Sequence, residues 1–154
     1  MATSHARLEL AQFKEIAPQA YSGLIMLGEA AVNAGLDKGL LELIKIRASQ
    51  LNGCAYCLQH HITLARKYGV PSIKIDLVAA WRDAGVFTSR ECAALDWTET
   101  LTRLENGDVP DAAYSAVRAE LSLDETAFLT SAIAVINAWN RIAIPFRSTP
   151  PGVG

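Results

Sequence analysis

Helix-start signals and helix breakers alternate along this 154-residue chain, and no alternating apolar run is bracketed by hairpin turns. Residues 88–91 (Thr-Ser-Arg-Glu) and 122–125 (Ser-Leu-Asp-Glu) have the form of a capping box, in which a hydroxyl and a carboxylate satisfy free N–H groups at a helix start. Between these signals, apolar residues recur at helical spacing. The pattern predicts an all-α fold. The predicted stops are Gly35, Asn52-Gly53, Gly69, Gly85 and Pro145.

The chain is long enough for one domain with a real core, and we expect it to cover residues 1–147. A short amphipathic stretch at 7–16 precedes about seven helices. Residues 148–154 are predicted to be a disordered tail. The predicted helices span 18–34, 37–52, 54–68, 72–84, 88–105, a shorter segment from 108, and 122–144.

Composition and charge exclude several classes of protein. The net charge is -2 and the Lys and Arg residues are scattered singly, so no basic stripe is available for nucleic acid. No apolar run approaches the roughly 20 residues of a membrane span, and the start lacks the form of a secretory signal. We therefore expect a cytoplasmic protein. Because 51% of the residues are apolar, some apolar surface is expected at a homo-oligomer interface.

A pair of cysteines, Cys54-Ala-Tyr-Cys57, stands at the predicted start of a helix. In a reducing compartment such a pair is more often catalytic or metal-binding than structural. On a helix, Cys54, Cys57 and His61 fall within about 60° of one another, on one stripe. Free N–H groups and the helix dipole stabilise a thiolate at a helix start, and His61 can accept or return its proton. The all-helical pattern excludes the thioredoxin fold, the usual setting of such a dithiol.

Other interpretations of the cysteines remain open. Both could be plain core residues, since free cysteine is commonly buried. A zinc site could use both thiols and His61, but structural zinc requires four ligands, usually as two pairs. Cys92, alone in an apolar stretch, is interpreted as core packing. No second chelating pair is available among the remaining candidates, His5, His60 and Cys92.

Glu42 lies twelve positions before Cys54, on the helix that leads into the dithiol. It shares a helix face with Ser49 and Gly53, so it could point at the base of the next helix. A carboxylate there could form a proton relay with His61, directly or through water. Taken alone, Glu42 would be an ordinary solvated residue.

The three tryptophans receive structural interpretations first. Trp81 and Trp97 lie among apolar neighbours at helical spacing and are expected in the core or at an interface. Trp139 could line the cavity or a subunit contact near the dithiol, or could be simple packing. The same alternatives apply to its polar neighbours Asn137, Asn140 and Arg141.

Residues 42–61 resemble the signature of the alkylhydroperoxidase D-like (AhpD-like) branch of the carboxymuconolactone decarboxylase family. That signature is a glutamate, eleven residues, Cys-x-x-Cys, three residues and a histidine. The chain matches it at Glu42, Cys54, Cys57 and His61. The resemblance is clearest over about 40–69 and returns in residues 137–143.

The resemblance implies an AhpD-like fold, a homotrimer or homohexamer, and a cysteine-dependent alkyl hydroperoxide reductase that needs no metal or cofactor. It implies that Cys57 is the peroxidatic thiolate and that Cys54, nearer the helix start and more exposed, resolves the sulfenic acid as a disulfide. Glu42 and His61 would form the relay that deprotonates Cys57. A dithiol reductant protein, lipoyl-carrying in relatives, would then reduce the disulfide.

The sequence departs from part of the family. Some family peroxidases carry a histidine between the cysteines where this chain has Tyr56, which points to a slower enzyme or another substrate. Decarboxylase members lack the dithiol, so lactone decarboxylation is disfavoured. Two alternative functions stay open: a redox-sensing or scaffold oligomer whose dithiol toggles without turnover, and a zinc-stabilised helical domain.

Overall fold

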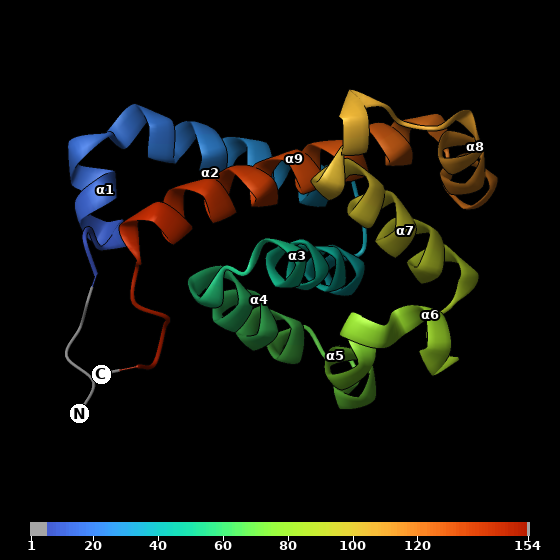
Figure 1. The fold of residues 1–154 in the computed structure, drawn as a ribbon, viewed down its shortest axis with the longest axis horizontal. Helices are drawn as coiled ribbons and strands as arrows, with labels where there is room; N and C mark the ends of the chain where they lie inside the picture. The colour runs from blue at the N-terminus through green and yellow to red at the C-terminus, as the bar shows by residue number, and fades with distance from the viewer. Residues whose placement is uncertain (1–5, 154) are drawn as a thin grey trace.

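The computed structural model describes residues 6–153. Within that range it contains nine α-helices, two short 3-10 helices and no β-strand, so the prediction of an all-α fold is confirmed (Figure 1). The α-helices are α1 Leu10–Ile16, α2 Pro18–Asn33, α3 Lys38–Asn52, α4 Ala55–Lys67, α5 Ser72–Leu77, α6 Trp81–Ala84, α7 Ser89–Arg103, α8 Asp111–Glu120 and α9 Leu123–Phe146. The 3-10 helices are Val78–Ala80 and Glu105–Gly107.

Helix α3 forms the centre of the fold and contacts α4, α7 and α9. Its apolar residues are buried around most of its circumference, as expected of a helix packed on several sides. Glu42 and Ser49 are buried on the same helix and are polar exceptions to this pattern. A buried carboxylate requires hydrogen-bonding or oppositely charged partners, so Glu42 is a candidate functional residue within the core.

Local sequence signals explain where the helices begin and end. The Asp37 side chain accepts a hydrogen bond from the Leu40 N–H at the start of α3, and both predicted capping boxes, at Thr88 and Ser122, are formed. Gly53 ends α3 with φ 73°, in the left-handed region that a residue without Cβ adopts at little energy.

The stretch predicted as one helix over 72–84 is broken into α5, a 3-10 turn and α6. Ile75, Val78 and Trp81, three residues apart, are all buried. A 3-10 turn keeps residues three apart on one face, whereas an α-helix rotates them progressively away. The break therefore keeps all three side chains against the core.

Helix α9 is 24 residues long and, by length and mean hydropathy alone, could cross a membrane, which the sequence prediction did not anticipate. In the fold it packs against α2, α3, α4 and α7, and its inner face is buried. It is thus a core helix. It also continues past its predicted end at Ile144, because Pro145 is accommodated in its last turn and the helix stops at Arg147 with φ 51°.

Ser148 and Thr149, at the start of the segment for which the sequence predicts disorder, contact the N-terminal segment, while residues 1–5 and Gly154 lie outside the described residues. Ser148 is buried and its hydroxyl donates to the Leu8 carbonyl at 3.2 Å. The Thr149 hydroxyl and N–H donate to the two carboxylate oxygens of Glu9 at 2.7 and 3.0 Å. These bonds pair residues 148 and 149 with residues about 140 positions earlier in the chain.

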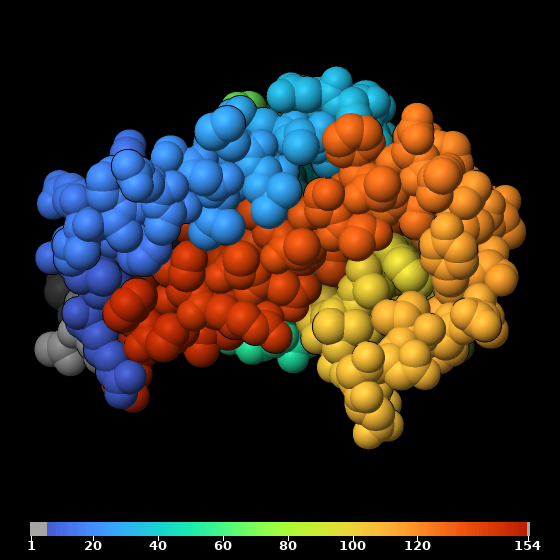
Figure 2. All heavy atoms as spheres, turned by 90° about the horizontal axis from the view of Figure 1, so that it is seen from above, coloured from blue at the N-terminus to red at the C-terminus, as the bar shows by residue number. Residues whose placement is uncertain are grey.

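Helix α2 lies alongside α9 on the surface of the molecule (Figure 2). Only Ala31 of its sixteen residues is buried. The helix instead exposes the large apolar side chains of Met26 and Leu27. Between α2 and the α3–α4 pair lies the region that contains the dithiol.

Candidate active site

The turn between α3 and α4 fixes both cysteines. Gly53 reverses the chain, and Cys54 becomes the N-cap of α4, where its Sγ accepts the N–H of Cys57 at 3.2 Å. The two residues are joined as a disulfide, with their Cα atoms 5.4 Å apart. The predicted pairing of two sulfurs in a first helical turn is therefore geometrically satisfied, and the structure represents the oxidised form.

The two sulfurs face different surroundings. Cys57 lines a cavity, whereas Cys54 is absent from the described residues that line it. Cys54 is 2% exposed and Cys57 4%, so the expectation that Cys54 is the more exposed thiol is wrong. Both cysteines belong to a small apolar cluster with Ala48, Ile136 and Ala143, and Cys57 also borders the cavity.

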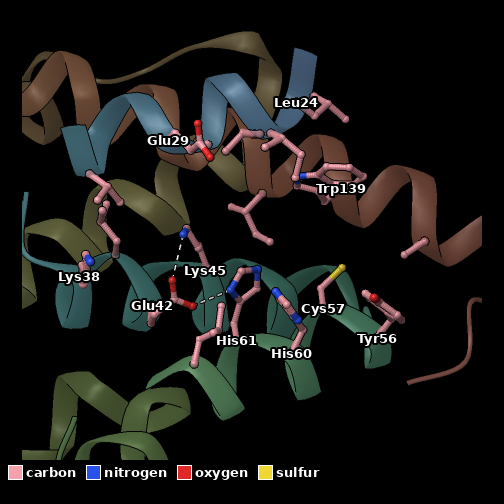
Figure 3. Close-up of a pocket in the computed structure, with 18 of the residues that line it drawn as sticks. Leu24, Glu29, Lys38, Glu42, Lys45, Tyr56, Cys57, His60, His61 and Trp139 are labelled. Atoms are coloured by element: carbon pink, nitrogen blue, oxygen red, sulfur yellow. Dashed lines mark hydrogen bonds and ion pairs between the residues drawn. The ribbon is translucent and has the colours of Figure 1, made fainter. Parts of the chain in front are cut away.

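Glu42 and His61 are in direct contact, as the predicted relay requires. The His61 Nδ1 lies 2.6 Å from Glu42 Oε2, and Lys45 Nζ donates to Glu42 Oε1 at 3.0 Å (Figure 3). Burial alone would raise the pKa of Glu42, but the hydrogen bonds and charges of His61 and Lys45 outweigh it and hold the pKa below its usual value. Glu42 is therefore an ionised carboxylate with a partner on each oxygen.

An ionised carboxylate only accepts hydrogen bonds, which assigns the tautomer of His61. Its Nδ1 must carry a proton and donate to Glu42. In the neutral ring, Nε2 then has a free lone pair, and it lies on the side of the ring away from Glu42. Figure 3 shows the His61 ring between the Glu42 carboxylate and Cys57, with both residues facing the cavity.

The cavity has a volume of about 560 Å³, which is in the range of small-molecule sites. The inner faces of α2 and α9 supply most of its apolar wall, including Leu24, Ile25 and Val135. Helices α3 and α4 supply the polar floor, where Glu42, His61 and Cys57 all border the cavity (Figure 3). An apolar wall over a few convergent polar groups suits an organic molecule with one reactive polar end.

Aromatic residues border the cavity near Cys57. Trp139 lines it and makes an edge-to-face contact with Tyr21, whose ring centroid is 5.4 Å away. Tyr56 also lines it and stacks against His60 at 6.3 Å. Partial desolvation and the neighbouring His61 lower the pKa of His60, which has no hydrogen bond to Glu42. The structure thus selects His61 as the partner of Glu42.

A polar network that sequence analysis did not identify holds the dithiol turn in place. Asn52, the last residue of α3, donates through Nδ2 to the Oδ1 atoms of Asn137 and Asn140 at 2.9 and 2.8 Å. Asn140 is fully buried and donates to the Ser49 hydroxyl at 3.1 Å. These contacts tie the α3–α4 turn to α9. Arg141 joins this network from the exposed face, where its Nη1 donates to Asn137 Oδ1 at 3.0 Å.

The remaining candidates have structural environments. Trp81 and Trp97 are in the core, as predicted, and Cys92 is half-buried against it. Within residues 6–153, no group of three or more His, Cys, Asp or Glu side chains is close enough to hold a metal ion. His5 lies outside the described residues. Lys45 is the functional candidate that sequence analysis missed, although its spacing of three from Glu42 on a helix was a usable signal.

Comparisons with known proteins agree with this geometry. The carboxymuconolactone decarboxylase family profile matches residues 18–100. The chain is 35% identical, over 86% of its length and 90% of the relative, to the uncharacterized protein YdfG of Bacillus subtilis.

Two solved structures share the fold. One is a protein of unknown function from Agrobacterium tumefaciens, for which a role as antioxidant defence protein AhpD has been suggested; it has a TM-score of 0.88 and 35% identity, with 96% of this chain and 99% of that one covered. The other is an uncharacterized peroxidase-related protein with an alkylhydroperoxidase AhpD core from Ralstonia eutropha. Its TM-score is 0.79 and its identity 25%, with 92% and 75% covered. The chain therefore belongs to the carboxymuconolactone decarboxylase family and has the AhpD-like fold.

Proposed function

We propose that the protein is a cysteine-dependent reductase of organic hydroperoxides. The observation that carries the proposal is one cavity that is lined both by a disulfide-forming cysteine, Cys57, and by an imidazole, His61, that is held by a buried carboxylate. Family membership supports a redox role for such a pair. The apolar walls favour an alkyl or aryl hydroperoxide over hydrogen peroxide, because the latter gains nothing from apolar contact.

The oxidative half of the cycle begins with reduced Cys57. His61 Nε2 receives the thiol proton, and the thiolate attacks an oxygen of the hydroperoxide. The O–O bond breaks, the alcohol leaves with the proton from His61, and Cys57 becomes a sulfenic acid. Cys54 then loses its thiol proton and attacks the Cys57 sulfur. The S–O bond breaks, the departing hydroxide takes up that proton and leaves as water, and the disulfide forms. The N–H of Cys57, which donates to Cys54 Sγ, favours the Cys54 thiolate needed for this step.

The reductive half requires two electrons from an external dithiol. One thiolate of the reductant attacks the disulfide, a cysteine leaves as its thiolate, and the second reductant thiol displaces the other cysteine. Since both sulfurs are nearly inaccessible, a dithiol on a slender arm fits better than one on a protein surface. A lipoyl-carrying protein has that form and is the proposed partner, in a reducing compartment such as the cytoplasm.

The test is steady-state consumption of cumene hydroperoxide with dihydrolipoamide as the electron donor. Cys57→Ser should reduce consumption to the background rate, whereas Cys92→Ser, the matched control at the third cysteine, should retain it. The oxidised protein should regain two thiols per chain after each addition of donor. A disulfide that forms once with no multiple turnover, under any tested hydroperoxide and donor, would instead support a redox sensor.

We also propose that the chain forms a homotrimer or homohexamer. Ile16 and Met26 are 72% and 71% exposed, and Met26 lies on α2, which also exposes Leu27. An apolar helix face of this kind is stabilised when a second copy covers it. Because the inner face of α2 lines the cavity, assembly would also stiffen one wall of the site.

A further inference from the structure

Lys45 forms an ion pair with Glu42 and has no role in the proposed catalytic cycle. Its ammonium group binds Glu42 Oε1 at 3.0 Å, while the His61 ring occupies the other oxygen. The side chains of Lys45, His61 and Glu42 are 13%, 11% and 4% exposed, so water competes little with either contact. Lys45 also lines the same cavity as Cys57 (Figure 3). A solvent-exposed ion pair at this helical spacing contributes little to stability, whereas the attraction between the two charges is stronger where water is excluded.

We propose that Lys45 is a positioning residue that keeps Glu42 permanently ionised, so that the proton leaving Cys57 stops at His61. A carboxylate that accepts a hydrogen bond from an ammonium on one oxygen and from an imidazole on the other is stabilised in its charged form. Glu42 then orients His61 and balances its positive charge without becoming protonated. The proton is held on Nε2, from which it can be returned to the departing alkoxide.

The other charged groups around the cavity do not replace Lys45. Helix α2 presents Glu29 and Tyr21 to the cavity, α4 presents Tyr56 and His60, and α3 also presents Lys38. The Lys38 ammonium instead lies over the Tyr68 ring, 5.4 Å from its centroid. The residues that α9 contributes to the wall are not titratable. Lys45 is therefore the cation of this cavity that binds Glu42.

The test measures the pH dependence of Cys57 alkylation by iodoacetamide in a Cys54→Ser background, with the modified peptide quantified by mass spectrometry. Removing a positive charge from the cluster disfavours the negatively charged Cys57 thiolate, which is the form that reacts with iodoacetamide. Lys45→Met should therefore move the alkylation midpoint upward by about 0.5–1 pH unit, which slows alkylation three- to tenfold below the midpoint. Lys45→Arg, which keeps the charge, should restore the parent midpoint.

Lys45→Gln provides a second uncharged variant that can still hydrogen-bond to Glu42, in case the methionine variant is poorly folded by thermal melting. It should shift the midpoint in the same direction. Lys67→Met, at an exposed position on α4, is the matched control and should leave the midpoint unchanged. An unshifted midpoint in both uncharged variants, or an equal shift in Lys45→Arg, would overturn the proposal. The inference rests on the proposed role of Cys57. Alkylation needs no peroxide, however, so the shift of the midpoint can be observed or refuted independently of the hydroperoxide assay.

Discussion

The hydrogen bond between His61 Nδ1 and Glu42 Oε2 determines which ring nitrogen is available to a thiol. Glu42→Gln removes the carboxylate that accepts the Nδ1 proton of His61 and balances the charge of imidazolium. We expect hydroperoxide consumption to fall about 10- to 100-fold, within the range of general acid–base contributions. The pH–rate profile should also change, because a neutral amide does not balance the charge that His61 gains with the thiol proton.

Glu29→Gln is the matched control for this prediction, because Glu29 lines the same cavity without contacting His61. Its rate and profile should remain close to those of the parent protein. Equal effects of the two substitutions would show that the charge of the cavity, and not the bond to His61, determines the rate.

Cys57 and His61 could be grouped with Cys54 from their helical spacing, whereas the role of Glu42 followed from the resemblance to the family signature. The burial of Cys54 could not be predicted, because it depends on Ile136 and Ala143, about eighty to ninety residues further along the chain. The role of Asn52 depends in the same way on Asn137 and Asn140. Local patterns specify a residue's helix and face, but not which distant helix covers it.

Among elements, the start of α7 is tied to the start of α9 by an ion pair between Arg90 and Glu125, with Nη2 and Oε1 2.6 Å apart. The hydrogen bond from Arg90 is the main cause that lowers the pKa of Glu125 from 4.5 to about 2. The Glu125 carboxyl group therefore binds its proton less tightly in the folded protein than in the unfolded chain. The ion pair stabilises the folded protein fully above about pH 4.5, and this contribution is lost as the pH falls toward 2.

Glu125→Gln tests this ion pair, since glutamine can still form the capping box at this position. We expect a loss of about 0.5–1 kcal/mol in the free energy of unfolding at pH 7, as for a partly exposed pair. The variant should also lose less stability than the parent between pH 5 and pH 3. Urea unfolding at several pH values measures both effects, and an unchanged acid dependence would contradict the assignment.

The junction of α3, α4 and α9 is a second element-scale feature. Asn52→Ala removes the donor shared by Asn137 and Asn140 and leaves their oxygens without this partner. We expect a loss of about 1–3 kcal/mol in the free energy of unfolding, measured with urea. Gln59→Ala, an exposed position on α4, should have little effect. A similar loss in both variants would mean that the network does not stabilise the turn.

Helix boundaries were predictable where a cap or a glycine marks them, as at Asp37, Gly53 and Ser122. The break within 72–84 was not, because apolar residues three apart fit both an α-helix and a 3-10 turn. The choice between them depends on the core surface against which Val78 and Trp81 pack. Pairing of the C-terminal segment with Glu9 likewise depends on contacts between the two ends of the chain.

At the scale of the whole molecule, α2 has two faces with separate roles. Its inner face lines the cavity with Leu24 and Ile25, and its outer face leaves Met26 exposed to solvent. If a second copy covers the outer face, Met26→Glu places a charge in an apolar interface and should shift the protein from three or six times the 16.6 kDa chain mass toward the single-chain mass. Sedimentation equilibrium measures this shift. Gln19→Glu adds the same charge at an exposed position on the first turn of α2 and should not dissociate the assembly. A parent protein that sediments at the mass of one chain would end the assembly proposal and leave the single-chain cavity as the complete site.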